Sequence, residues 1–196
     1  MSDHLYLNIW FGDSELVETL AHAVTVMRLF PFSQELAGIR NFALHPVSWG
    51  EATIVEQRFH PGIPPDQAAI LGAGLAHEDY AYVFEANWDL WTPRANGEWI
   101  LEPSIVRFIA RGEEFEDGES ETQGEVQIDF GLDAPFLHEE LQLSAELELR
   151  VRNNVQKLVD FTVAIQKNSG AKTRLLWSES DENLAQKLIS RLQRVQ

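Results

Sequence analysis

His77, Glu78 and Asp79 form the densest cluster of side chains that could bind a metal ion. Imidazole and carboxylate ligands together suit zinc, manganese or iron. Three consecutive side chains rarely all face one ion, however, and the helical zinc motif His-Glu-x-x-His is incomplete because Ala81 occupies the place of the second histidine. We therefore expect a solvated loop here, with metal binding as the alternative.

Two more histidines stand directly before prolines, His45 before Pro46 and His60 before Pro61. They end two segments that we expect to pair as strands about Gly50. In such a hairpin the two imidazoles could lie close enough to bind a metal or to share a proton. The simpler interpretation is that each residue marks a strand end, because proline interrupts strand pairing.

Three tryptophans lie around an Asn96-Gly97 pair, which is typical of hairpin turns. Trp88 and Trp91 are three positions apart, so their rings face opposite sides of a strand. One ring can enter the core while the other covers a surface or cleft, and Trp99 follows the turn. Exposed rings would indicate a ligand platform or a protein interface, and core packing is the default expectation.

Acidic residues are concentrated between positions 113 and 125. Their spacing lacks the EF-hand pattern, so a calcium site is not expected. We expect an acidic hairpin loop, and the alternative is a docking site for a basic partner protein. The interface candidates in this run are Glu113, Glu114, Glu116 and Asp117.

The whole chain is acidic as well, because 31 Asp and Glu against 15 Lys and Arg give a formal net charge of −16. Such a surface repels nucleic acid and anionic membranes and would attract a basic partner. The simpler interpretation is that the acidity only keeps the protein soluble. The chain has no cysteine, which excludes disulfides and thiol chemistry and fits a reducing cytosol. Neither a signal-peptide pattern nor an apolar run long enough to span a bilayer is present. We therefore expect a cytoplasmic protein that binds neither nucleic acid nor membrane.

The familiar cofactor and nucleophile motifs are incomplete in this sequence. The glycine-rich segment 72–77 lacks a third glycine and follows an expected helix, whereas a dinucleotide-binding loop follows a strand. No Gly-x-Ser-x-Gly elbow and no phosphate-binding Gly-Lys-Ser/Thr occurs. We expect no cofactor, and whether the chain is an enzyme stays open.

Hydrophobic spacing predicts an α+β fold with an antiparallel or mixed β-sheet and helices packed mainly on one face. The expected strands include residues 5–10, 80–91, 99–101, 105–109 and 126–130. With a helix at 16–30, two strands about Gly50 and a short helix opening at Pro64-Pro65, the chain begins in a βαββαβ order, the element pattern of a ferredoxin-like fold. A β meander and a C-terminal α-β-α segment follow.

The segment 141–151 is ambiguous, because its apolar residues fit both strand alternation and helical spacing. Its Glu, Leu, Arg and Gln content favours a helix, which we expect to begin near Ser144 and to end before Gly170. A short strand at 173–177 and a last helix with an apolar face reaching Val195 would follow. No linker divides the chain, so we expect one domain spanning residues 1–196.

Three functions are compatible with these features. The leading hypothesis is a non-enzymatic acidic protein-interaction module of the inhibitor or immunity type, motivated by the charge, the tryptophans and the missing catalytic motifs. The second is a small-molecule-binding protein or enzyme with a histidine and carboxylate site in a cleft. The third is a structural protein that forms homodimers through exposed aromatic residues.

Overall fold

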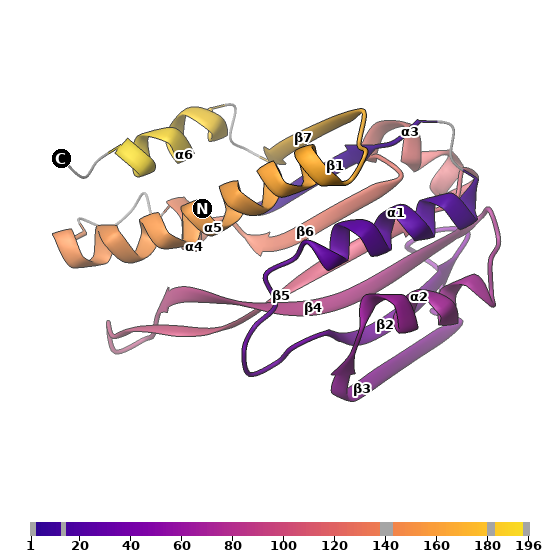
Figure 1. Cartoon of the computed structure of the whole chain (residues 1–196), viewed down its shortest axis with the longest axis horizontal. Coiled ribbons are helices and arrows are strands. Elements are labelled where there is room, and N and C mark those ends of the chain that lie inside the picture. Colours follow the sequence, from indigo (N-terminus) through magenta and orange to yellow (C-terminus); the bar gives the residue numbers. More distant parts are fainter. Residues whose placement is uncertain (1–2, 13–14, 138–142, 180–182, 194–196) are drawn as a thin grey trace.

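A computed structural model describes residues 3–12, 15–137, 143–179 and 183–193. These residues form one seven-stranded antiparallel sheet and six α-helices, which confirms the α+β class (Figure 1). In chain order the elements are β1 (His4–Trp10), α1 (Leu16–Arg28), β2 (Ile39–Pro46), β3 (Val55–Ile63), α2 (Pro65–Ala73), β4 (Tyr80–Pro93), β5 (Trp99–Arg111), the 3-10 turn η1 (Phe115–Asp117), α3 (Glu119–Gln123), β6 (Val126–Leu132), α4 (Ala134–Leu137), α5 (Ala145–Asn168), β7 (Thr173–Ser178) and α6 (Leu184–Gln193). Within the described ranges, no helix has the length and apolar character needed to cross a bilayer.

The strands are ordered β3-β2-β4-β5-β6-β1-β7, and every neighbouring pair is antiparallel. The first six elements follow the expected βαββαβ order, but the sheet does not confirm the ferredoxin-like expectation. A ferredoxin-like unit would place one strand between the two parallel strands that its first helix joins. Here the whole meander β4-β5-β6 lies between β1 and β2, and α1 passes over it (Figure 1).

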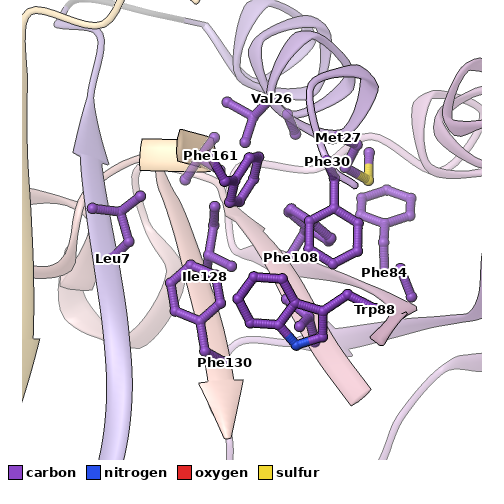
Figure 2. Close-up of a cluster of buried hydrophobic side chains, with 14 of the residues drawn as sticks. Leu7, Val26, Met27, Phe30, Phe84, Trp88, Phe108, Ile128, Phe130 and Phe161 are labelled. Atoms are coloured by element: carbon purple, nitrogen blue, oxygen red, sulfur yellow. The ribbon is translucent and has the colours of Figure 1, made fainter. Parts of the chain in front are cut away.

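The main core lies on the face of the sheet that the helices cover. Figure 2 shows Trp88 of β4 packed among aromatic rings from several elements. The ring centroids of Trp88 and Phe130 in β6 are 5.3 Å apart. The ring centroid of Phe30, just after α1, lies 5.1 Å from that of Phe108 and 5.2 Å from that of Phe161. Aromatic pairs at these distances attract each other beyond the gain from burial. The cluster therefore holds α1 and α5 to the centre of the sheet.

The ambiguous segment is helical from Ala145 onward. Helix α5 begins after Ser144, whose hydroxyl accepts a hydrogen bond from the backbone N of Leu147 at 3.4 Å. Its buried residues, which include Val151, Val155 and Leu158, recur at helical spacing and reach the main core. The expected start and end of this helix are confirmed, while positions 141 and 142, like Val195, lie outside the described residues.

The acidic run joins β5 and β6, which pair antiparallel as expected for a hairpin, but it is folded into η1 and α3 and is not a plain loop. Phe115 within the run is fully buried and anchors the segment. Farther along, the Glu125 carboxylate accepts hydrogen bonds from the backbone N of Phe11 at 3.0 Å and of Gly12 at 2.8 Å. Several acids of this run therefore have partners within the protein.

Candidate functional site

The face of the sheet opposite the main core carries polar and aromatic side chains. Successive residues of a strand point to opposite faces, which places Tyr6 and Asn8 of β1 and Arg111 of β5 on this open face. Gln127 and Asp129 of β6 follow the same rule. All of these except Asn8 border, together with neighbouring side chains, a hollow of about 330 Å³, called the open-face hollow below. Its lining residues are Tyr6, Trp49, Ile109, Arg111, Glu119, Gln123, Gln127, Asp129, Trp177 and Glu179.

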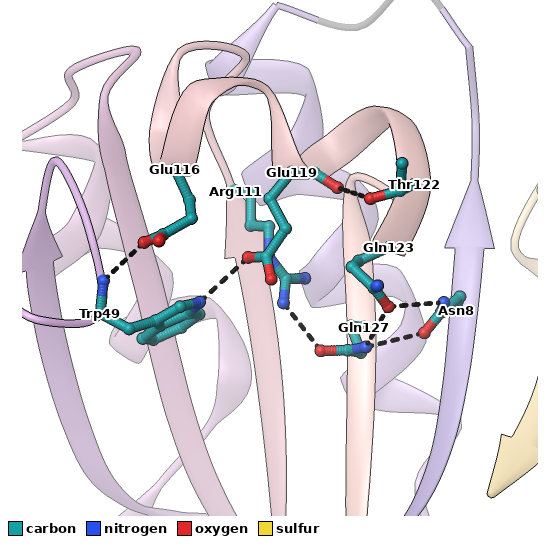
Figure 3. A network of polar contacts seen from close by, with 8 residues as sticks. All are labelled: Asn8, Trp49, Arg111, Glu116, Glu119, Thr122, Gln123 and Gln127. Carbon is teal, nitrogen blue, oxygen red and sulfur yellow. Dashed lines mark hydrogen bonds and ion pairs between the residues drawn. The ribbon is translucent and has the colours of Figure 1, made fainter. Parts of the chain in front are cut away.

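The strand order places aromatic rings on two sides of the open-face hollow. Trp177 of β7 and Tyr6 of the neighbouring β1 stack with their ring centroids 4.9 Å apart. Trp49 comes from the loop between β2 and β3 and lies on the other side, beyond β5 (Figure 3). Arg111 and Gln127 lie between these walls and form a polar floor.

Arg111 is charged and yet only 3% exposed. Its Nε donates to Glu119 Oε2 at 2.7 Å, and its Nη2 donates to Gln127 Oε1 at 2.7 Å (Figure 3). Its Nη1 is also buried, and no hydrogen-bond partner for it occurs among the described residues. Burial lowers the pKa of Arg111, and the Glu119 carboxylate opposes this shift. A buried guanidinium with a missing hydrogen bond costs free energy, so the surrounding packing must hold it in place.

Side-chain amides continue the floor from Arg111 across β6 to β1. Gln127 Nε2 donates to Asn8 Oδ1 at 2.8 Å and to Gln123 Oε1 at 3.2 Å, and Asn8 Nδ2 donates to the same Gln123 oxygen at 3.1 Å (Figure 3). These bonds fix the amide of Gln127 so that its oxygen faces Arg111. The floor of the hollow is therefore preorganised.

Trp49 is held over this floor by two acids of the run. Its indole Nε1 donates to Glu119 Oε2 at 3.0 Å, and its backbone N donates to Glu116 Oε2 at 2.8 Å (Figure 3). Among the described residues, the three non-glycine residues with positive φ are Val47 at 60°, Glu116 at 49° and Asp117 at 54°. Glu116 also donates its backbone N to the Val47 carbonyl at 2.8 Å, so the strained segments meet beside Trp49. Backbone strain persists where surrounding contacts enforce it and is concentrated at functional sites.

Replacing Val47 with glycine is expected to raise the free energy of unfolding by about 1 kcal/mol, because a left-handed conformation costs a side-chain-bearing residue about 1–2 kcal/mol. Val47 is 53% exposed, so little packing is lost. The matched control is Ile54→Gly, which removes a 51% exposed side chain of the same loop and is expected to lower stability. Urea unfolding monitors both variants, and a loss of stability in Val47→Gly would show that the loop is not strained.

Negative charge gathers around Tyr6. Burial, followed by the Asp129 and Glu179 carboxylates, raises the pKa of Tyr6 to about 12, against a smaller opposing effect of Arg107. Asp129 Oδ1 lies 3.1 Å from His4 Nδ1 and accepts a hydrogen bond from the backbone N of Gly131 at 2.8 Å. These contacts fix the Asp129 carboxylate at the edge of the hollow.

His45 packs against Trp49. The two rings are edge to face with centroids 5.0 Å apart, and His45 Nδ1 is buried without a hydrogen-bond partner among the described residues. Burial lowers the pKa of His45, and Glu56 opposes the shift. The neutral imidazole is therefore the form that the folded protein favours.

Acidification is expected to destabilise the protein through His45. Between the lowered folded pKa and the ordinary value of about 6.5, the unfolded chain binds more protons than the folded chain, so stability falls as the pH drops from 7 toward 5. His45→Gln should reduce this loss, as measured by urea midpoints at pH 7.5 and 5.5. A second variant, His22→Gln, removes the other histidine whose pKa burial lowers. An unchanged loss in His45→Gln would contradict the assignment.

The histidine candidates lie apart in the structure. The strand register pairs Leu44 with Val55 and Asn41 with Arg58, so His45 lies at the Gly50 end of the hairpin and His60 at its far end, in contact with Arg40. The two imidazoles are therefore not brought together, because His45 and His60 lie at opposite ends of the paired strands.

His77 contacts the carboxylate of Asp79 and stacks on Tyr80 with ring centroids 5.0 Å apart. His77 and Glu78 are exposed, and they border a separate hollow that also includes Glu114. Within the part of the chain that the structure describes, no three histidine, cysteine, aspartate or glutamate side chains are grouped so that they could hold a metal ion.

The tryptophan candidates do not form a shared platform. Trp88 is fully buried and Trp99 is 6% exposed, so neither ring is available to a partner. Trp91 is half-buried and packs against the main core, and the guanidinium carbon of Arg150 in α5 lies 4.6 Å from its ring centre. Of the acidic candidates, Glu113, Glu114, Glu116 and Asp117 are exposed, and Glu116 holds Trp49 as described above.

Sequence reasoning missed the residues of the open-face hollow. Tyr6 alternates with the apolar residues of its strand, and Arg111 ends the alternating series Arg107, Ile109, Arg111 in an otherwise apolar segment. This alternation is a signal for a second, polar face of the sheet. It could not show that Trp49 and Trp177, distant in sequence, border the same hollow.

The fold and the hollow define an α+β protein with one helix-covered sheet face and one open face. Comparison of the chain with models of known protein families, with curated proteins and with solved structures finds no match. The function must therefore be argued from the site alone.

Proposed function

We propose that this chain is a non-enzymatic protein-interaction module that binds a basic partner protein through the open face of its sheet. The observation that carries the proposal is the open-face hollow, where Trp49, Trp177 and Tyr6 gather above the buried Arg111. Tryptophan, tyrosine and arginine are the residues that dominate the hot spots of protein interfaces. The strained loop that presents Trp49 supports the same role, because strain is concentrated at binding sites.

Apolar side chains extend this face beyond the hollow. Leu175 of β7 is exposed beside Asn8, and Ile105 of β5 is exposed on the same face. Ile109 joins Ala43 and Val83 in a small apolar cluster that is separate from the main core. Apolar surface bordered by polar groups is typical of an interaction site.

The charge of the chain supports a basic partner. A formal net charge of −16 attracts and steers a positively charged protein. The inhibitor or immunity type of module is a natural subclass, because such proteins act by binding alone. The second candidate of the sequence, a histidine and carboxylate site in a cleft, is the weaker one. His77, Glu78 and Glu114 border one hollow, but among the described residues no three such side chains are grouped to hold a metal ion. The larger hollow of about 540 Å³ between α1 and α5 has no histidine in its lining.

Affinity capture from an extract of the source organism tests the proposal. Leu175→Arg places a charge on the open face, and Leu149→Arg places the same charge on an exposed position of α5. We expect wild type and Leu149→Arg to retain a basic protein that Leu175→Arg loses and that high salt releases.

Two results would contradict the proposal. One is a partner that both arginine variants retain equally, which would place the interface elsewhere. The other is a dimer of the isolated chain in light scattering that Leu175→Arg dissociates, since the open face would then bind a second copy. The homodimer hypothesis is tested by that same measurement.

A further inference from the structure

The lining of the open-face hollow carries more negative than positive charge. Glu119, Asp129 and Glu179 contribute carboxylates, and Arg111 contributes a guanidinium. The Arg111 charge is matched by Glu119, whose Oε2 lies 2.7 Å from Nε. The remaining carboxylates of the lining are those of Glu179, which is exposed, and Asp129, which is largely buried beside Tyr6.

Neighbouring cations cancel this charge only in part. Arg107 Nη1 lies 3.7 Å from Asp129 Oδ2, but Arg107 Nε is already paired with Glu85 at 2.8 Å. His4 also contacts Asp129 and carries a charge only when protonated. A positively charged ligand group is consequently favoured beside Tyr6, between Asp129 and Glu179.

The aromatic walls favour the same kind of group. The face of an aromatic ring carries partial negative charge and attracts ammonium and guanidinium groups. The protein already uses this attraction, since the guanidinium carbon of Arg111 lies 5.7 Å from the ring centre of Trp49. On the opposite side, the Tyr6–Trp177 stack offers a second aromatic surface.

The size of the hollow limits what it can hold. Its volume of about 330 Å³ is at the lower end of the range of about 300–1,000 Å³ that small-molecule sites occupy. It is also open on the sheet surface, where a side chain of a docked protein can enter. One long side chain suits this space better than a cofactor.

We propose that the open-face hollow receives one lysine or arginine side chain of the basic partner, with the cation between Trp49 and the Tyr6–Trp177 stack and beside Asp129 and Glu179. This inference rests on the proposed function and names the chemistry by which the partner is recognised. The Arg111–Glu119 pair is a positioning element in it, because it fixes the indole of Trp49 rather than contacting the ligand.

Capped glycine peptides with one central arginine, lysine or glutamate test the inference on the full chain. We expect the arginine and lysine peptides to perturb tryptophan fluorescence and the glutamate peptide to leave it unchanged. Trp177→Leu should weaken binding of the arginine peptide about tenfold. Glu179→Gln should weaken it about threefold at low salt, whereas Glu113→Gln removes an equal charge outside the hollow and should leave it unchanged.

Equal binding of the glutamate peptide, or equal effects of Glu179→Gln and Glu113→Gln, would overturn the inference. Circular dichroism checks that each variant is folded. If Trp177→Leu does not fold, Glu179→Gln still tests the site. If Leu175→Arg abolishes capture of the partner but Glu179→Gln and Trp177→Leu do not weaken it, the inference is wrong and the proposed function stands. If cationic peptides bind but no partner depends on Leu175, the proposed function is wrong and the cation cannot be assigned to a partner protein.

Discussion

Trp88→Ala is expected to lower the free energy of unfolding by about 4–5 kcal/mol, because removing a buried large aromatic side chain loses its burial energy and leaves a cavity. Trp88 is fully buried at the centre of the sheet. Its ring centroid lies 5.3 Å from that of Phe130, 5.5 Å from that of Phe30 and 5.8 Å from that of Phe136. Rings from three other segments lose a neighbour at once, so the cavity cannot collapse easily.

Trp88→Phe is the matched control for this prediction. It keeps an aromatic ring in the stack and removes the indole N–H, which is buried without a hydrogen-bond partner among the described residues. Removing an unsatisfied buried donor recovers part of the lost packing energy. We expect a loss of about 1 kcal/mol or less, as measured by urea unfolding. A loss below 2 kcal/mol in Trp88→Ala would show that the core repacks around this position.

Local elements were predictable because their signals are local. Ser144 and Gly170 flank a helix whose apolar residues recur every three or four positions, and the structure has that helix. The strand order was not predictable in the same way. A βαββαβ sequence of elements is compatible with one intervening strand or with three, and the pairing of β1 with β6 joins segments more than a hundred residues apart.

The candidate site shows why density of a residue type is a poor guide to function. Trp88, Trp91 and Trp99 are close in sequence, and two of them are buried where the β4–β5 hairpin packs against helices. Trp49 and Trp177 are far apart in sequence and border one hollow. The strand order β5-β6-β1-β7 brings Trp177 to one side of the hollow, and hydrogen bonds to Glu116 and Glu119 hold Trp49 of the β2–β3 loop at the other.

Glu119→Ala is expected to lower the free energy of unfolding by about 3 kcal/mol, because it leaves the buried Arg111 guanidinium without its counter-ion. Glu119 also accepts the indole N–H of Trp49, so a second donor loses its partner. The Glu119 side chain is 23% exposed, and water entering its place keeps the loss at the lower end of the range of about 3–5 kcal/mol measured for broken buried pairs. Glu121→Ala, an exposed position of the same short helix, should change stability by about 0.5 kcal/mol or less.

The double variant Arg111→Met/Glu119→Leu separates stability from binding. Replacing both partners of a buried ion pair by apolar residues of similar size is often neutral, so most of the stability should return. Trp49 would still lack the carboxylate that fixes its indole, and the hollow would lose one wall of defined geometry. We therefore expect the free energy of unfolding of the double variant to lie within about 1 kcal/mol of the wild-type value. The double variant should nevertheless no longer retain the basic partner. A double variant as unstable as Glu119→Ala would mean that Glu119 stabilises the fold through Trp49 rather than through the charge of Arg111.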